Sequence, residues 1–214
     1  MPRLTQEQLE AKYEEMYAYE KQAREDGYGF PGGIDEAGRG PLAGPVVAAC
    51  CILDPNVKIL GLDDSKKLSE KKREELFVQI KEKALAYAVC AESPETIDEI
   101  NILEATKKAM RRCVAEIGVK PDILLIDAVK LEGTGLPVIP IIKGDAKSDS
   151  IAAASILAKV TRDHLMVDYD KEYPGYGFAK HKGYGTKLHY EMLDKYGPCK
   201  IHRQTFLRTW YEKK

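Results

Sequence analysis

The sequence predicts an α/β fold in which a mixed sheet is flanked by helices, with a small helical part at the C-terminal end. Two observations lead to this fold class. Strand-like runs come first along the chain, and helical segments then alternate with further strand-like runs. The most apolar run, residues 46–53, has no charged or hydroxyl side chain, so both of its faces must be covered. We therefore expect helices on both faces of the sheet.

The N-terminal third is predicted to hold a helix followed by two strands. Residues 5–25 contain no Gly or Pro and are rich in Glu, Lys and Ala, which favours a polar helix that leads into Gly27. A short strand is expected at 33–35, directly before a glycine-rich turn. The run 46–53 then forms a strand that is long and apolar enough to be central in the sheet.

The middle of the chain is predicted to alternate between helix and strand. Ser69 can cap a helix over residues 69–84, and a strand-like segment follows at 86–91. Ser93 and Pro94 then begin a second helix that continues to Gly118, because Pro is favoured at the first helical position and Gly after the last.

The C-terminal part begins with two short apolar strands, at 123–126 and 138–142, and each is followed closely by an aspartate. A long helix is expected from Ser150 to about residue 173, where Pro174 closes it. The remaining elements are a glycine-rich loop, a short helix over 186–196 and one or two helical turns over 202–210.

Composition restricts the class of protein. The 214 residues are 44% hydrophobic and 31% charged, which is ordinary for one globular domain with appendages. The five cysteines are odd in number and lack C-x-x-C spacing, so we expect reduced thiols rather than disulfides or a zinc site. The sequence shows neither a leader-like N-terminus nor an apolar run of about 18 residues, and we expect a cytoplasmic protein without membrane contact.

Charge is unevenly distributed along the chain, although the formal net charge is only -1. Residues 1–36 contain four Lys and Arg against nine Asp and Glu, whereas residues 176–214 contain nine against three. Positive charge therefore gathers at the C-terminal end, where a polyanion is expected to dock.

Four carboxylates are candidates for a metal site. Asp35 and Glu36 end one predicted strand, and Asp127 and Asp145 follow two others. Together they form the hard-oxygen ligand set that Mg²⁺ or Mn²⁺ prefers, and two such ions could drive phosphodiester hydrolysis. Neighbouring residues of a strand point to opposite faces, so Asp35 and Glu36 serve one site only if the chain turns or a ligand acts through backbone or water.

Ordinary surface roles are the alternative interpretation of the same residues. A solvated acidic turn followed by a basic one accounts for Asp35, Glu36 and Arg39, and separate strand-end acids account for Asp127 and Asp145. The glycines around Arg39 favour the functional interpretation, because they form a tight turn whose backbone can approach a ligand closely.

Several motifs, taken in order, resemble those of the ribonuclease HII family, and the resemblance covers residues from about 30 to 208. The long helix resembles that of bacterial members. The motifs are the runs 33–46, 64–68, 143–148, 150–163 and 182–186, the strand-end Asp127, and His202-Arg203-Gln204-Thr205-Phe206.

The resemblance implies a ribonuclease H-like fold in which Asp35, Glu36, Asp127 and Asp145 are catalytic and coordinate the metals. It further implies that the turn Gly38-Arg39-Gly40 contacts the ribose 2′-hydroxyl and that Tyr184 packs on the following sugar. The 2′-hydroxyl is the group that separates RNA from DNA at one nucleotide. Ser65, Lys66 and Lys147 are also expected to bind nucleic acid, although solvated lysines explain the last two equally well.

The implied protein is a metal-dependent endonuclease acting on RNA–DNA hybrids and on duplex DNA containing ribonucleotides, as a monomer and with no protein partner identified. It would cut 5′ to a ribonucleotide and leave 5′-phosphate and 3′-hydroxyl ends. A hybrid-binding module without metals, or another nuclease of the same fold, is the alternative. We expect three parts: an N-terminal helical extension (1–26), a ribonuclease H-like core (27–174) and a C-terminal helical substrate-binding part (175–214).

Overall fold

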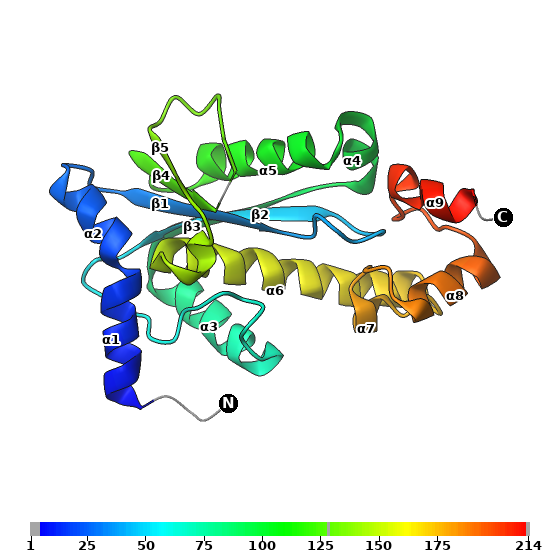
Figure 1. Ribbon diagram of the computed structural model, residues 1–214, viewed down its shortest axis with the longest axis horizontal. Coiled ribbons are helices and arrows are strands. Elements are labelled where there is room, and N and C mark those ends of the chain that lie inside the picture. The colour runs from blue at the N-terminus through cyan, green and yellow to red at the C-terminus, as the bar shows by residue number, and fades with distance from the viewer. Residues whose placement is uncertain (1–4, 128, 213–214) are drawn as a thin grey trace.

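A five-stranded mixed sheet forms the centre of the protein, as predicted (Figure 1). The computed structural model describes residues 5–127 and 129–212, so the outermost residues of the predicted N-terminal and C-terminal parts lie outside it. The strand order is β3-β2-β1-β4-β5, with β1 antiparallel to β2, β2 antiparallel to β3, and β1, β4 and β5 parallel. The strands are β1 (Pro31–Ala37), β2 (Val46–Leu53), β3 (Ala84–Glu92), β4 (Ile123–Asp127) and β5 (Val138–Ile141).

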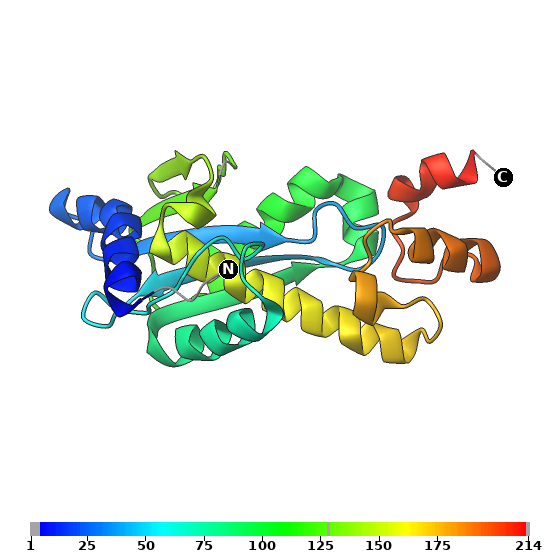
Figure 2. The same ribbon diagram turned by 60° about the horizontal axis from the view of Figure 1, so that its bottom comes forward.

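Helices cover both faces of the sheet, which explains why β2 is apolar throughout (Figures 1 and 2). Alternate residues of β2 point to opposite faces. Ala49 and its neighbours two residues away pack towards α6 (Asp149–Glu172) and α3 (Glu70–Lys83). Ala48, Cys50 and Ile52 pack towards α5 (Ile102–Glu116).

The long helix α6 packs unusually close to β1. A Cβ built on Gly33 would lie 2.1 Å from the backbone carbon of Ser150, so only glycine allows this approach. The small side chains of residues 152–154 are fully buried at the same interface. The helix consequently runs directly beneath the strand that carries Asp35.

Two predicted helices are each divided in two. The predicted N-terminal helix breaks at Tyr17 into α1 (Gln6–Met16) and α2 (Ala18–Glu25). The predicted 94–118 helix breaks at Asn101 into α4 (Pro94–Ile100) and α5, because Asn101 adopts a left-handed conformation (φ 67°) and its side chain caps α5. Apolar periodicity continues across the second break, so it did not reveal the change of direction.

The two ends of α6 meet different appendages (Figure 1). Helices α1 and α2 lie where α6 begins, and the C-terminal helices lie where it ends. These are α7 (Phe178–His181), α8 (Lys187–Tyr196), the 3-10 helix η2 (Gln204–Leu207) and α9 (Arg208–Tyr211). None of the helices within residues 5–127 and 129–212 combines the length and hydropathy needed to cross a lipid bilayer.

Candidate active site

The predicted carboxylates gather where β1 and β4 end. These strands pair in parallel through Ile34 and Ile126, so the next residues, Asp35 and Asp127, are neighbours across the sheet. Asp127 Oδ1 accepts a hydrogen bond from the backbone N–H of Gly144 (2.9 Å). That bond ties the end of β4 to the short 3-10 helix η1 (Gly144–Ala146), which carries Asp145.

Burial, and after it electrostatic repulsion, raises the pKa values of carboxyl groups in this cluster. Burial, followed by the negative charges of Glu36 and Asp127, raises the pKa of Asp35 well above its ordinary range. Burial and then the charges of Asp64 and Asp127 raise the pKa of Asp145 to about 6. A nearby cation would stabilise the charged form of carboxyl groups whose pKa is raised in this way.

Asp35 and Glu36 point to opposite faces of β1, as expected for neighbours in a strand. Asp35 is hydrogen-bonded by Ser155 of α6. Glu36 pairs across the sheet with Ala48, on the face that α5 covers, and Arg39 lies 3.4 Å from its Oε1. Its other oxygen, Oε2, is buried and has no hydrogen-bond partner among the described residues.

The four carboxylates are close in space but do not surround one point. Among residues 5–127 and 129–212, no three His, Cys, Asp or Glu side chains converge tightly enough to hold a metal ion. The site therefore has the donor atoms and the shared negative field of a cation site, but its side chains would have to turn inwards to form a coordination shell.

Asp64 is a fifth carboxylate that the sequence reasoning missed. Its negative charge helps to raise the pKa of Asp145, and its Oδ1 accepts a hydrogen bond from the backbone N–H of Lys66 (2.9 Å). Burial lowers the pKa of Lys66, but Asp145, Asp64 and Asp35 together outweigh burial and raise it. The motif containing Asp64 was recognised, but its position in a loop gave no sign of which carboxylate it would meet.

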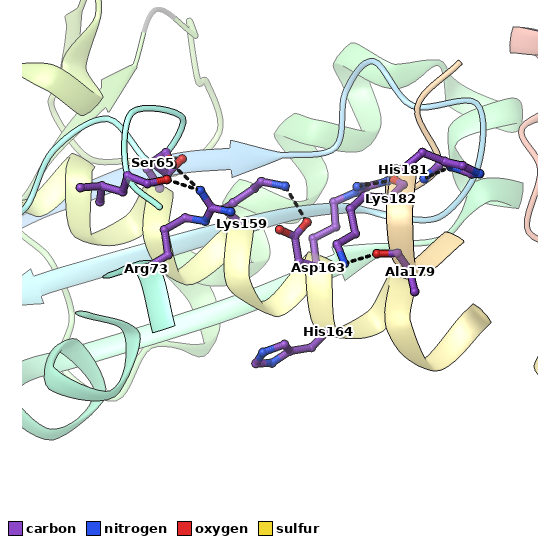
Figure 3. A network of polar contacts seen from close by, with 12 residues as sticks. Ser65, Arg73, Lys159, Asp163, His164, Ala179, His181 and Lys182 are labelled. Carbon is purple, nitrogen blue, oxygen red and sulfur yellow. Dashed lines mark hydrogen bonds and ion pairs between the residues drawn. The ribbon is translucent and has the colours of Figure 1, made fainter. Parts of the chain in front are cut away.

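The other predicted nucleic-acid contacts near the carboxylates differ in exposure. Ser65 is buried, and its Oγ lies 2.9 Å from Ser155 Oγ. Its carbonyl accepts from Arg73 Nη1 (3.0 Å), a contact visible in Figure 3. Lys66 and Lys147 are exposed, and Lys147 directly follows η1. The two lysines can thus reach a ligand from the surface, whereas the Ser65 side chain is buried against Ser155, which is hydrogen-bonded to Asp35.

The glycine-rich turn after β1 brings its exposed residues beside Tyr184. Gly38 has φ 94°, and a Cβ there would lie 2.1 Å from Nε of the buried Arg162, so this position requires glycine. Arg39 and Gly40 are exposed. A Cβ on Gly40 would meet only the Tyr184 ring, at 3.9 Å. The turn and the tyrosine, predicted from distant motifs, therefore form one surface.

Two buried arginines, which the sequence reasoning did not single out, hold this turn. Arg203 donates to the carbonyls of Gly38 (2.6 Å), Arg39 (3.0 Å) and Gly44 (2.8 and 3.0 Å). Arg162 reaches the carbonyls of residues 43, 45 and 182, at 2.9–3.1 Å. Burial lowers the pKa of Arg203 to about 9 and that of Arg162 to about 10, so both are protonated at neutral pH.

A chain of neutral histidines supports the loop behind Tyr184. His202 Nδ1 accepts a hydrogen bond from the backbone N–H of Cys199 (2.9 Å). The proton of the neutral His202 ring is therefore on Nε2, which donates it to His189 Nε2 (3.0 Å). His189 Nδ1 then donates to the carbonyl of Tyr184 (2.9 Å), and its ring stacks on His181 at 4.4 Å. Burial lowers the pKa of His189 and of His202 to about 4. These rings position a loop rather than bind a metal.

Comparison with known proteins decides the family. The family model described as Ribonuclease HII matches residues 32–214. This chain belongs to the ribonuclease HII family. It is 56% identical over 199 residues to the ribonuclease HII of Acetivibrio thermocellus, covering 93% of this chain and 78% of that protein. It is 58% identical over 195 residues to that of Desulfitobacterium hafniense strain DCB-2, covering 91% of this chain and 75% of that protein.

Solved structures show the same fold for members of this family. The ribonuclease H2 of Pyrococcus horikoshii superposes with a TM-score of 0.71 at 28% identity, covering 86% of this chain and 98% of that one. The ribonuclease HII of Archaeoglobus fulgidus, solved in complex with PCNA, superposes with a TM-score of 0.71 at 30% identity. The match covers 82% of this chain and 94% of that one. The predicted ribonuclease H-like fold and the predicted enzyme class, an endoribonuclease, are confirmed.

Proposed function

We propose that this protein is a divalent-metal-dependent endonuclease that hydrolyses the RNA strand of RNA–DNA hybrids and cuts 5′ to ribonucleotides embedded in duplex DNA. The products are 5′-phosphate and 3′-hydroxyl ends. The observation that carries the proposal is the meeting of Asp35, Glu36, Asp127 and Asp145 at one end of the sheet, beside the turn that contains Arg39. Membership of the ribonuclease HII family supports the same activity.

The donor set suits Mg²⁺ or Mn²⁺. Carboxylate oxygens are the ligands such hard cations prefer. Oε2 of Glu36, buried and without a hydrogen-bond partner in the described part of the chain, is the kind of atom that a cation satisfies. Asp35, Glu36, Asp127 and Asp145 would hold the ions once their side chains turn to a common point. Two bound ions would supply an activated water and a counter-charge for the leaving 3′-oxygen.

The protein's own groups would orient this chemistry. Gly144 would fix one oxygen of Asp127, and Ser155 and the backbone of Glu36 would fix Asp35, so hydrogen bonds orient both carboxylates. Lys66 lies beside the carboxylates, where its ammonium group can contact a backbone phosphate. Lys147, exposed after Asp145, is placed for a second such contact.

Recognition of the ribonucleotide is assigned to the turn and Tyr184. Arg39 and Gly40 are exposed, and the absence of a side chain at Gly40 leaves room for a ribose to approach the backbone. A 2′-hydroxyl there can exchange hydrogen bonds with backbone groups, which a deoxyribose cannot do. The Tyr184 ring, 44% exposed, offers an apolar face to the following sugar.

We expect the protein to act as a monomer on its duplex. The Archaeoglobus fulgidus relative was solved in complex with PCNA, so a PCNA-type protein is the first protein partner to test. Binding would be measured with the purified proteins and with no nucleic acid present.

The deciding experiment is incubation of the purified protein with a labelled duplex containing one ribonucleotide, in Mg²⁺ or Mn²⁺, beside an all-DNA duplex. Cleavage 5′ to the ribonucleotide with no cleavage of the all-DNA duplex is the expected result. Binding without cleavage in either ion would favour the hybrid-binding module, and cleavage of the all-DNA duplex would favour a different nuclease of this fold.

A further inference from the structure

The N-terminal extension reaches into the start of α6 through one buried carboxylate. Glu20 of α2 is 1% exposed. Its Oε1 accepts hydrogen bonds from Ser148 Oγ (2.5 Å), Ser150 Oγ (2.5 Å) and the Ser150 backbone N–H (2.9 Å). A side chain that precedes Ser150 by 130 residues therefore satisfies the first turn of the longest helix in the fold.

This capped helix start continues directly into the segment that carries Asp145. Ser148 is the N-cap of α6, and its Oγ also accepts from the backbone N–H of Ile151 (3.3 Å). Its own backbone N–H donates to the carbonyl of Gly144 (2.9 Å), which closes the turn around Asp145. Ser148 therefore links the Glu20 carboxylate, through its side chain, to the turn that carries Asp145, through its backbone N–H.

The extension has a second contact on the other side of the carboxylates. Lys12 of α1 forms an ion pair with Asp63. Asp63 Oδ1 accepts from the backbone N–H of Asp64 (2.8 Å), and Asp64 lies close enough to Asp145 for its charge to raise the pKa of Asp145. The extension thus touches both loops that border Asp145, although neither α1 nor α2 carries any of the proposed metal ligands.

We propose that the N-terminal extension is a positioning element for the carboxylate site, and that Glu20 is its main positioning residue. By capping α6, Glu20 holds residues 143–148 in one arrangement and so fixes where Asp145 presents its oxygens. The inference rests on the proposed function, because it takes Asp145 to be a metal ligand. A group that orients a ligand without touching the ion typically changes metal affinity about 10–100-fold when it is removed.

The test compares Glu20→Ala with Glu20→Gln. Alanine removes the acceptor for all three hydrogen bonds, whereas glutamine keeps an oxygen in the same place. Glu14→Ala is the matched control, because Glu14 lies on the same extension but is 64% exposed and pairs with Lys58 (2.6 Å). Mn²⁺ affinity is measured by calorimetry, hydrogen exchange of the amides of residues 143–150 by mass spectrometry, and kcat and KM on the single-ribonucleotide duplex.

The expected result is an approximately 10–100-fold weaker Mn²⁺ affinity for Glu20→Ala. Exchange at 143–150 should be faster and kcat lower, with little change in KM. Glu20→Gln should recover most of each loss, and Glu14→Ala should match the wild type. If Glu20→Ala does not fold, Ser150→Ala replaces it; this variant removes one donor to Glu20 and should shift the same readouts in the same direction by less.

Two outcomes distinguish failure of the positioning inference from failure of the proposed function. If the wild type binds Mn²⁺ and the tested variant binds it equally well with unchanged exchange, Glu20 has no positioning role and the proposed function stands. If the wild type binds no Mn²⁺, or if Asp145→Asn leaves its affinity unchanged, the assignment of Asp145 as a ligand fails, and the positioning inference fails with it.

Discussion

The carboxylate cluster and the recognition turn, our name for the turn Gly38-Arg39-Gly40 that we propose contacts the ribose, lie along the same helix, α6, but they are built in opposite ways. At the turn, the guanidinium groups of Arg162 and Arg203 donate hydrogen bonds to backbone carbonyl oxygens. At the carboxylates, like charges raise one another's pKa, and Glu36 Oε2 is buried without a partner among the described residues. The polar groups of the turn are satisfied within the protein, whereas Arg39 and Lys66 offset only part of the negative charge of the carboxylates.

The difference has a physical reason. Recognition of a 2′-hydroxyl needs backbone groups held in one geometry, and planar guanidinium groups can hold several carbonyls at once. Cation binding needs free oxygens, and an oxygen already paired with an arginine is a poorer ligand. Arg39 is exposed and lies 3.4 Å from Oε1 of Glu36, and the second oxygen, Oε2, has no hydrogen-bond partner within residues 5–127 and 129–212.

The largest expected effect comes from neutralising a carboxylate. Asp127→Asn and Asp145→Asn should each reduce cleavage by orders of magnitude, because an amide is a poorer ligand for a hard dication. Without metal, thermal stability should stay level or rise, since one repelling charge is gone. Rates and melting temperatures with and without Mg²⁺ test this, with the exposed Asp168→Asn as control. Near wild-type rates in either variant would remove that residue from the metal site.

The next effect concerns Tyr184, whose ring borders the turn at Gly40. Tyr184→Ala should cut a single-ribonucleotide duplex far more slowly and lose proportionally less on a long RNA–DNA hybrid, because the ring favours a deoxyribose after the ribonucleotide. Tyr184→Phe should keep this preference if packing causes it. Equal losses on both substrates would show that Tyr184 is no junction sensor; Tyr19→Ala, on the remote α2, is the control.

Removing the guanidinium group of Arg203 should destabilise the turn and lower the free energy of unfolding. Arg203→Met keeps the alkyl chain but leaves the carbonyls of residues 38, 39 and 44 without their donor, which is expected to cost about 3 kcal/mol of unfolding free energy. Urea unfolding measures the loss, and the exposed Arg208→Met is the neighbouring control. A loss below about 1 kcal/mol would mean that water replaces the guanidinium and that the turn is less dependent on Arg203 than its contacts indicate.

The smallest effect is the contribution of two histidines on the recognition side to the pH dependence of stability, which adds to that of the buried carboxylates. Burial lowers the folded-state pKa of His189 and His202 from 6.5 to about 4, so the unfolded chain takes up protons first. Their contribution to stability is complete above pH 6.5 and is lost as the pH falls towards 4. Melting temperatures across this range, with NMR titration of the rings, test the account. A ring that titrates near 6.5 in the folded protein would contradict it.

The sequence by itself determined the features that depend on local pattern. Apolar runs placed the strands, because a buried strand needs continuous hydrophobic side chains. The glycines around Arg39 predicted a turn open to a ligand, and the acids that end strands predicted a cluster, since parallel strands finish at the same edge. The motif order predicted the family, which the comparisons confirm.

Only the tertiary structure decided which polar groups support the site. Glu20 looked like one more acid of a polar helix, but its carboxylate is hydrogen-bonded by Ser148, 128 residues later. Arg203 looked like part of a basic C-terminal segment, yet it holds the carbonyl of Gly38, 165 residues earlier. Spacing within a segment fixes periodicity and turns, but a buried polar side chain is satisfied by whichever distant segment packs against it, and local sequence does not encode that partner.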